Sequence, residues 1–316
     1  MSTPLLRVRD LAVDFFQRGE LQNSPLRGIS FDIEAGKTLG IVGETGCGKT
    51  LTAMAILHLL PKNASVNGQM WVDGIGELNE TDMTKVRGSE ISIIFQNPHS
   101  AFNPVFTIGA QLRIVARARK IPTQEIESLL TERLHEVGLH DSTRVLDSFP
   151  HQLSGGMLQR CMIAMALIKR PRLLIADEPT TALDTTVGKA ILLLIKELQR
   201  KEGFAMIFIS HNVGVISEVS DDVAVLYAGK IVETGPTAEV LQLPQHPYSQ
   251  GLLGALPTKE KERGKLNSIP GQVPQLKSTM EGCSFQERCS LRTNRCLQTP
   301  ELHQVANSLV ACWEVK

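Results

Sequence analysis

The 316-residue sequence is poor in aromatic side chains, which make up 4% of it, and it has no excess of charge of either sign. Thirty-three Lys and Arg residues balance thirty-three Asp and Glu residues. A neutral chain creates no strong field toward nucleic acid or anionic lipid, so we expect no nucleic-acid partner. The 42% apolar content is nevertheless enough for a substantial core.

Long apolar runs are also missing. The longest lie near residues 52–60 and 191–195, well short of the ~20 residues that a bilayer-spanning helix needs. The first ten residues are charged and lead into a strand-like segment, which is not the pattern of a secretory signal. We therefore expect a soluble chain that reaches a membrane only through partner proteins.

Cysteine is scarce in most of the chain and concentrated at its C-terminal end. Cys47 and Cys161 stand alone, whereas four cysteines share the last stretch with spacings of x₅, x₆ and x₁₅: Cys283, Cys289, Cys296 and Cys312. Cytosolic proteins seldom keep disulfides, so this group indicates a metal rather than cross-links. The spacings do not match the paired C-x₂-C of common zinc sites, but four thiolates are what a 4Fe–4S cluster needs.

Residues 43–50, GETGCGKT, fill every fixed position of the phosphate-binding loop G-x-x-x-x-G-K-[ST]. The apolar, β-branched run Thr38–Val42 precedes them and a stretch of helical character follows. The glycines allow consecutive N–H groups to face one concavity at a helix N-terminus, which suits a polyphosphate. Lys49 is predicted to reach the β- and γ-phosphates, and Thr50 to ligate Mg²⁺. A glycine-rich turn that binds nothing is the weaker alternative.

Two further segments fit phosphate chemistry. The predicted strand Leu173–Asp177 ends in a carboxylate that would hold the Mg²⁺ shell, and Glu178 after it could polarise an attacking water. Ser154 is a good helix N-cap, and the two glycines after it permit close approach to an anion. Taken alone, a solvated strand end would explain the first segment about equally well, and an ordinary turn is the better explanation of the second.

Strands and helices alternate along the chain, which predicts an α/β fold with a doubly wound parallel sheet, split by a helical insertion. Strands are predicted at residues 5–13, 28–33, 38–42, 69–72, 91–96, 173–177 and 205–210, with a closing hairpin at 223–226 and 230–234 around Ala228–Gly229. Helices are predicted at residues 108–120, 124–137, 158–169 and 187–202. The chain becomes rich in Pro and loops after Pro236, so we place a domain boundary near residue 240.

The motifs occur in a fixed order: the phosphate loop, then QNP, LSGGMLQR, LLIADEP, TALD and ISHN. In this order they resemble the ATP-binding subunit of an ABC transporter. The wider segments QNPHSAFNPVFTIG, FPHQLSGGMLQRCMIAMAL, LYAGKIVETG, HPYSQGLLGALP and IPGQVP are similar to those of the dipeptide/oligopeptide/nickel importer family. The resemblance covers almost the whole chain.

The resemblance implies a P-loop NTPase (ABC ATPase) core with an antiparallel β subdomain, a helical subdomain and a small C-terminal Cys-rich extension. The ABC domain would span residues 1–240, with the helical subdomain at about 97–157, and the extension would span 241–316. The family carries a similar four-cysteine tail that in some members holds a 4Fe–4S cluster. We therefore expect that cluster here, with zinc or free thiols as alternatives.

Residue roles follow from the same resemblance. Glu178, His211, Gln96 and Lys49 would be catalytic, His211 as the switch histidine that contacts the γ-phosphate. The adenine-stacking aromatic would be Phe15, although the adjacent Phe16 competes for that role. Cys47 stands where a Ser is common, and Met157 where many cassettes have Gln. The residues that bind this chain's own ATP would be Phe15, Gly43, Glu44, Thr45, Gly46, Cys47, Gly48, Lys49, Thr50 and Leu51.

Three other roles are implied. The ATP bound by the partner subunit would contact Ser154, Gly155, Gly156 and Met157. Asp184 would lie in the loop that crosses the dimer interface, and Mg²⁺ would be held by Thr50, Gln96 and Asp177.

The resemblance further implies an ATPase that powers di- or oligopeptide import by closing and reopening a head-to-tail dimer. Its partners would be a second ABC ATPase subunit, two transmembrane permease subunits and an extracytoplasmic solute-binding protein. In this family the second ATPase is commonly a different chain, so we expect a heterodimer. The chain would sit peripherally on the cytoplasmic face of the inner membrane. Nickel or another small solute is the alternative cargo, and a non-transport ABC ATPase is the weaker alternative function.

Overall fold

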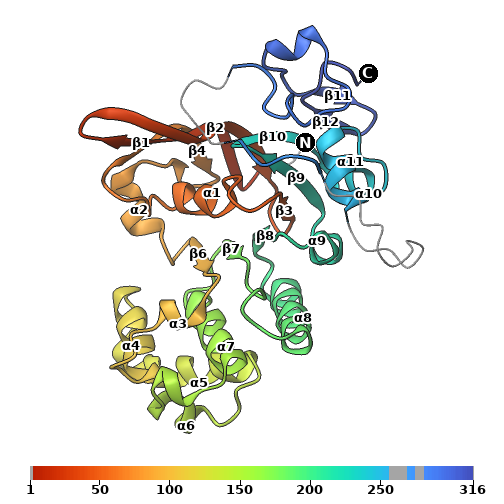
Figure 1. Cartoon of the computed structure of the whole chain (residues 1–316). Helices are drawn as coiled ribbons and strands as arrows, with labels where there is room; N and C mark the ends of the chain where they lie inside the picture. Colours follow the sequence, from red (N-terminus) through yellow and green to blue (C-terminus); the bar gives the residue numbers. More distant parts are fainter. Residues whose placement is uncertain (1–2, 256–268, 275–280, 316) are drawn as a thin grey trace. The chain divides into compact units, whose positions relative to one another are not determined.

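The computed structural model describes residues 3–255, 269–274 and 281–315 (Figure 1). The chain forms two compact units. The first unit comprises Met1–Glu34, Thr38–Leu78 and Phe208–Lys316, and the second comprises Ala35–Lys37 and Asn79–Ile207. The second unit is therefore inserted in sequence between two halves of the first. Of the predicted C-terminal extension, residues 256–268, 275–280 and 316 lie outside the described residues.

The first unit contains an antiparallel sheet with the order β2-β1-β4-β5, which confirms the predicted antiparallel subdomain. Its strands are β1 (Leu6–Gln17), β2 (Glu20–Ile33), β4 (Ala64–Val72) and β5 (Gly76–Glu77). β1 and β2 are longer than the sequence predicts. Their outer ends meet in a two-residue turn in which Arg18 and Gly19 both have positive φ (53° and 85°), as a tight hairpin with the usual strand twist requires.

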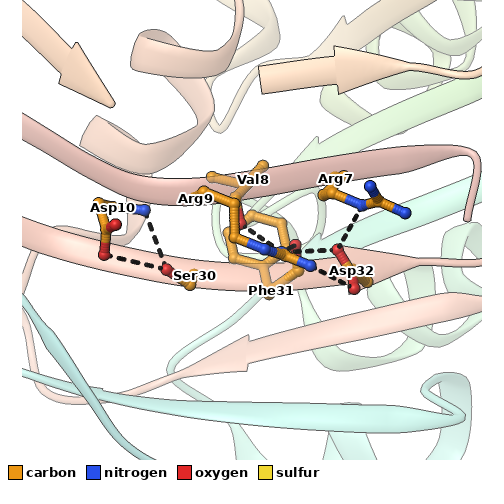
Figure 2. A network of polar contacts seen from close by, with 7 residues as sticks. All are labelled: Arg7, Val8, Arg9, Asp10, Ser30, Phe31 and Asp32. Carbon is orange, nitrogen blue, oxygen red and sulfur yellow. Dashed lines mark hydrogen bonds and ion pairs between the residues drawn. The ribbon is translucent and has the colours of Figure 1, made fainter. Parts of the chain in front are cut away.

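β1 carries a bulge at Asp10, where its pairing with β2 shifts register between Val8 and Leu11. Figure 2 shows how side chains of β2 support this irregular stretch. The Ser30 hydroxyl accepts the Asp10 N–H at 2.9 Å, and Arg9 donates to both carboxylate oxygens of Asp32 at 2.7 and 2.8 Å. On the other side of β1, a Cβ at Gly68 would lie 2.5 Å from the Asp10 carbonyl, so only glycine fits there.

The larger sheet has the order β11-β12-β10-β9-β3-β8-β7-β6. Its strands are β3 (Thr38–Val42), β6 (Ile91–Ile94), β7 (Leu173–Asp177), β8 (Ala205–Ile209), β9 (Asp222–Tyr227), β10 (Lys230–Pro236), β11 (His303–Val305) and β12 (Ser308–Val310). β3 pairs with β9, and β6 with β7, in parallel, as the sequence predicts. β9 and β10 form the predicted hairpin around Ala228 and Gly229, both at positive φ (46° and 77°).

The C-terminal hairpin β11–β12 has no counterpart in the sequence prediction. β12 pairs with β10 through Glu233 and Thr234, and Ala311 donates its N–H to the Val232 carbonyl at 2.9 Å. The strands are only three residues long each, so alternation of apolar and polar residues gives little signal there. The C-terminal segment, which we define as residues 281–315, is thereby joined to the sheet of the first unit.

Helices in the first unit are α1 (Lys49–Ile56), α9 (Val213–Val219), α10 (Thr237–Gln242), α11 (Pro247–Gly254) and the 3₁₀ turn η3 (Asn294–Leu297). Those in the second unit are α2 (Glu80–Val86), α3 (Pro98–Ala101), α4 (Ile108–Ala118), α5 (Ile126–Glu136), α6 (Ser142–Asp147), α7 (Gly155–Ala166), α8 (Thr185–Glu202) and the turns η1 (Thr123–Glu125) and η2 (Pro150–Gln152). The run from α3 to α6 is the predicted helical insertion. In the part of the chain that is described, no helix combines the length and apolarity needed to cross a bilayer.

A buried ionic cluster ties α5 to α8 within the second unit. The Arg133 side chain, 2% exposed, bonds to Glu136 at 2.6 Å and also to Glu202. Lys201 donates to Glu136 at 2.7 Å. Burial raises the pKa of Glu136, but its bonds to Lys201 and Arg133 outweigh this effect and hold that pKa below its ordinary value. The Glu136 carboxylate at this helix contact is therefore ionised and needs its cationic partners.

Arg133→Ala is expected to destabilise the chain strongly, because buried Glu202 loses its bond to Arg133 and buried Glu136 keeps only its bond to Lys201. The expected loss in the free energy of unfolding is about 3–5 kcal/mol. A matched control is Arg113→Ala, which breaks the more exposed Arg113–Glu127 pair and should cost less than about 1 kcal/mol. Chemical unfolding of the full chain measures both, and equal losses for the two variants would contradict the assignment.

Candidate functional site

The phosphate loop lies in the first unit, between the fully buried strand β3 and helix α1. Gly48 is the N-cap of α1 with φ of 110°, a conformation that glycine adopts without strain. The Lys49 side chain is 6% exposed, and its Nζ donates to the Gly43 carbonyl at 2.9 Å and to the Glu44 carbonyl at 3.1 Å. The predicted lysine is thus held against the loop that would carry the phosphates.

The loop is packed closely against strand β9 and the turn after it. A Cβ at Gly43 would lie 2.1 Å from the Leu226 carbonyl and 2.8 Å from the Cys47 sulfur, so no other residue fits at Gly43. Gly229 donates its N–H to the Cys47 carbonyl at 3.0 Å. Burial raises the pKa of the Cys47 thiol, although nearby Lys49 opposes the effect. A neutral, buried thiol is consistent with a loop that uses the backbone at this position.

His211 also belongs to the first unit and follows strand β8. Ser210, which is buried, donates its N–H to the Ile41 carbonyl at 3.2 Å and so ties this strand end to β3. Asn212 caps helix α9 by accepting the N–H groups of Gly214 and Val215. His211 therefore stands exposed between a fixed strand end and a capped helix, close in sequence to the end of a buried strand, as predicted.

In the second unit, the parallel pairing of β6 with β7 brings two predicted catalytic residues together. Ile94 pairs with Ala176, so Gln96 and Glu178 each stand two residues further along neighbouring strands. Gln96 Nε2 donates to Glu178 Oε2 at 3.1 Å, and the Thr181 hydroxyl donates to the same oxygen at 2.9 Å. The strands thus position a carboxylate that is held by two neutral donors and accessible to solvent.

Glu178 has a φ of 47°, which is rare for a residue with a side chain. Strained backbone of this kind costs of the order of 1–3 kcal/mol and persists where the surroundings impose it, often at functional sites. Here the N–H of Thr181 donates to the Glu178 carbonyl at 3.2 Å and closes the turn. The conformation turns the chain sharply after the buried strand, and the next residue, Pro179, is buried.

The predicted Mg²⁺ ligands suit the ion by their chemistry. Asp177 is 2% exposed at the end of β7, and Thr50 and Gln96 supply hydroxyl and amide oxygens. Hard cations such as Mg²⁺ take carboxylate, hydroxyl and amide oxygens. Thr50 belongs to the first unit and the other two residues to the second.

Ser154 is the N-cap of α7 and accepts the Met157 N–H at 3.3 Å. Of the two glycines that follow, Gly155 faces Leu183 in the turn before α8, and a Cβ at Gly156 would come 2.8 Å from Val187 in α8. Asp184 caps α8 by accepting the N–H groups of Thr186 and Val187 at 3.1 and 3.0 Å. Within the second unit, the predicted signature and the predicted interface loop are therefore neighbours.

Phe15 and Phe16 occupy successive positions of β1. Phe15 pairs with Asn23 on β2 and Ala64 on β4, and it is half-buried, whereas Phe16 is 37% exposed. The pairing of β1 with β2 shifts register on both sides of Phe15, so the regular alternation of side chains between the two faces of the sheet does not decide which ring faces a bound base. The choice of Phe15 for adenine stacking stays a prediction.

The four C-terminal cysteines lie in one region but do not form a metal site as they stand. All are free thiols, and Cys283 donates its N–H to the Cys296 carbonyl at 2.8 Å. Burial, with smaller contributions from the other three cysteines, raises the pKa of Cys283 to about 11. Four thiols suit an iron–sulfur cluster chemically. However, nowhere in residues 3–255, 269–274 or 281–315 do three or more His, Cys, Asp or Glu side chains have the arrangement of a metal site.

Comparisons with known proteins agree with this geometry. The ABC transporter family profile matches residues 26–181, and the profile of the oligopeptide/dipeptide transporter C-terminal region matches residues 232–296. A probable peptide ABC transporter ATP-binding protein of Sinorhizobium fredii is 42% identical over 98% of this chain and 94% of its own length. A dipeptide transport ATP-binding protein of Bacillus subtilis is 42% identical over 92% of this chain and 88% of its own.

The chain belongs to the ABC transporter ATP-binding proteins, in the oligopeptide/dipeptide transporter branch. The fold agrees: a dimeric ATP-binding cassette solved in a post-hydrolysis state with ADP and Pi has a TM-score of 0.63 and 25% identity, covering 73% of this chain and 98% of that one. The predicted α/β fold class and the ABC-type ATPase activity of this protein are thereby confirmed.

Sequence reasoning missed several contacts of this ABC ATPase. The Glu178–Thr181 bond could have been expected, because both residues lie in the motif that runs from the strand into TALD. The contacts of Glu44 with Tyr248 and Arg288 could not. These two partners are 204 and 244 residues away in sequence, and a Tyr or an Arg in a loop-rich tail carries no signal of its own.

Glu178→Gln is expected to retain ATP binding and to lose turnover. Glutamine keeps the size of the side chain and can still meet Thr181, but it cannot orient and polarise a water as a carboxylate does. The loss in kcat should be at least about 100-fold. A phosphate-release assay with a parallel ATP-binding measurement checks it, and full hydrolysis by this variant would refute the role of Glu178. Glu197→Gln on the exposed side of α8 is the matched control.

Proposed function

We propose that this chain is the ATP-hydrolysing subunit that powers import of di- or oligopeptides through an ABC transporter. The cargo class is supported by the match of residues 232–296 to the oligopeptide/dipeptide transporter C-terminal region. It is also supported by relatives that are named for peptide transport and that this chain matches over most of their length. Hydrolysis is supported by the position of the Glu178 carboxylate, which accepts hydrogen bonds from Gln96 and Thr181 just after a buried strand.

The proposed chemistry is phosphoryl transfer to water. The phosphate loop holds ATP with Lys49 on the β- and γ-phosphates, Glu178 orients the attacking water, and His211 contacts the γ-phosphate. Thr50, Gln96 and Asp177 would hold Mg²⁺, which supplies neutralisation of the phosphate charge. Positioning and electrostatics provide most of the catalysis in such reactions. Phe15 stacks on the adenine in this proposal.

The proposed working unit is a pair of ATPase subunits arranged head to tail. Ser154, Gly155 and Gly156 would grip the γ-phosphate of ATP bound by the partner subunit, and Asp184 would lie at the interface. The N-cap position of Ser154 at α7 supports this role, because N–H groups at a helix start favour an anion. ATP would hold the pair shut and hydrolysis would let it open. We propose a heterodimer.

The proposed membrane partners are two permease subunits, served by an extracytoplasmic solute-binding protein, with this chain on the cytoplasmic face of the inner membrane. The helical subdomain at about 97–157 follows Gln96 and would pass motion to the permeases. It exposes large apolar side chains, with Val105 69%, Phe106 49% and Ile114 60% exposed. The ABC domain would span residues 1–240, and the extension 241–316.

Reconstitution tests the proposal most completely. The full chain, its partner ATPase and the permeases are reconstituted in vesicles loaded with ATP and Mg²⁺, and the binding protein is added outside. Uptake of labelled di- and oligopeptides is expected, and it should disappear with Lys49→Ala, because the phosphates lose their cation. Uptake of nickel but not of peptides would favour the alternative cargo. ATP hydrolysis without transport of either solute would contradict the import function.

We keep the 4Fe–4S cluster as a prediction for the four C-terminal cysteines. Its support is the four free thiols gathered in one segment, Cys283, Cys289, Cys296 and Cys312. Protein purified without oxygen should be brown, with iron and sulfide in equal amounts, and Cys289→Ser should lose both. Colourless protein with stoichiometric zinc, or with no metal, would refute it. Cys161→Ser, far from the segment in sequence, is the matched control.

A further inference from the structure

Every polar group of Glu44 is bonded: its carbonyl within the phosphate loop, its N–H to α11, and its carboxylate to the C-terminal segment. Its carbonyl accepts from Lys49 Nζ at 3.1 Å and from the Cys47 N–H at 3.3 Å. Its own N–H donates to the Tyr248 hydroxyl at 2.9 Å. Its carboxylate accepts two bonds from Arg288, at 2.9 and 3.2 Å. One residue therefore connects the lysine that would bind phosphate to a side chain 244 positions later in the sequence.

All five N–H donors of the Arg288 guanidinium are hydrogen-bonded. Beyond Glu44, the Arg288 side chain donates to the Tyr227 hydroxyl at 3.3 Å, to the Pro270 carbonyl at 2.7 Å and to the Ile269 carbonyl at 3.3 Å. The side chain is 7% exposed. The Glu44 side chain is 25% exposed, so the buried and fully bonded arginine fixes the geometry of this bidentate pair, unlike that of a solvated surface pair.

An aromatic cluster surrounds the pair. The rings of Tyr227, Tyr248 and Phe285 lie with centroids 4.5 to 5.5 Å apart. The Arg288 guanidinium lies 5.7 Å from the Tyr227 ring and 5.9 Å from the Phe285 ring. Burial raises the pKa of the Tyr248 phenol, so its hydroxyl stays neutral and available to accept the Glu44 N–H. The cluster combines β9, α11 and the C-terminal segment beneath one loop residue.

We propose that Arg288 is a positioning residue of the phosphate loop, acting through Glu44. By holding the Glu44 carboxylate, Arg288 fixes the peptide whose carbonyl orients Lys49, so the loop is already shaped when the nucleotide arrives. Shaping a loop before binding removes an ordering cost from the binding step. The C-terminal segment is therefore part of the machinery that sets ATP affinity. This inference rests on the proposed role of Lys49 and the loop in holding ATP.

Arg288→Ala in the full chain is expected to weaken binding of ATP, measured with Mg²⁺ by titration calorimetry, about tenfold. In steady-state hydrolysis, KM for ATP should rise while kcat stays within about twofold, since Arg288 touches no reacting atom. Arg288→Lys, which keeps the charge but not the two-pronged geometry, should recover part of the affinity. Arg292→Ala, an exposed arginine of the same segment, is the matched control and should bind as the wild type does.

A double-mutant cycle with Glu44→Gln separates positioning through Glu44 from a general loss of structure. Glu44→Gln alone should weaken ATP binding to a similar extent, and Arg288→Ala should add little to it. Additive effects, or an Arg288→Ala affinity equal to that of Arg292→Ala, would overturn the inference. Should Arg288→Ala fail to fold, Arg288→Lys and Glu44→Gln complete the test. A wild type that does not bind ATP would instead overturn the proposed function.

Discussion

The parallel pairing of β6 with β7 is the constraint on which the catalytic part of this protein depends. Parallel strands end at the same edge of a sheet, and ligands bind beyond that edge. The pairing of Ile94 with Ala176 leaves Gln96 and Glu178 side by side, although 82 residues separate them in sequence. Because Asp177 completes the buried strand, the carboxylate of the next residue is presented with little freedom of position.

The phosphate loop has a similar dependence on its surroundings. The close approach of the Leu226 carbonyl leaves room only for glycine at Gly43, and the turn after β9 holds Cys47. Glu44 is held by Tyr248 and Arg288. A short loop that contributes few apolar contacts is thus kept in shape by residues from three later parts of the chain, which is why a tail far from the motif in sequence bears on nucleotide affinity.

Much of the fold and of the candidate site could be predicted from the sequence, because several motifs have a fixed length and follow a recognisable strand. The strands before the phosphate loop and before Glu178 have the predicted bounds, since both are short apolar runs with a functional residue at the end. The sequence prediction missed the outer ends of β1 and β2 because these ends are exposed, even at the apolar Leu21 and Phe16, and so lack the alternation of buried apolar and exposed polar residues that marks a half-buried strand. The short C-terminal hairpin was missed because it is stabilised by pairing with β10, which no local pattern reveals.

Residue roles that depend on a local sequence pattern could be predicted, whereas those that depend on long-range contacts could not. Ser154 is recognisable as a helix cap from sequence alone, and the structure confirms it as the cap of α7. Asp184, which the sequence predicted only as an interface-loop residue, is found to cap α8. The choice between Phe15 and Phe16 depends on how the irregular end of β1 presents the two rings to a base. The metal state of Cys283 and the other three C-terminal cysteines depends on side-chain distances. Residue type and spacing determine neither the adenine-stacking residue nor the metal bound by the cysteines, so both stay predictions.

The central claim is that this chain is one half of a closing pair, in which each ATP is held by the phosphate loop of one subunit and the signature of the other. The most direct measurement is a structure of the closed pair of full-length ATPase subunits with Mg²⁺ and a non-hydrolysable ATP analogue. We expect the Ser154 hydroxyl to lie within hydrogen-bond distance of the γ-phosphate of the nucleotide bound by the partner. A closed pair in which Ser154 contacts no nucleotide would contradict it.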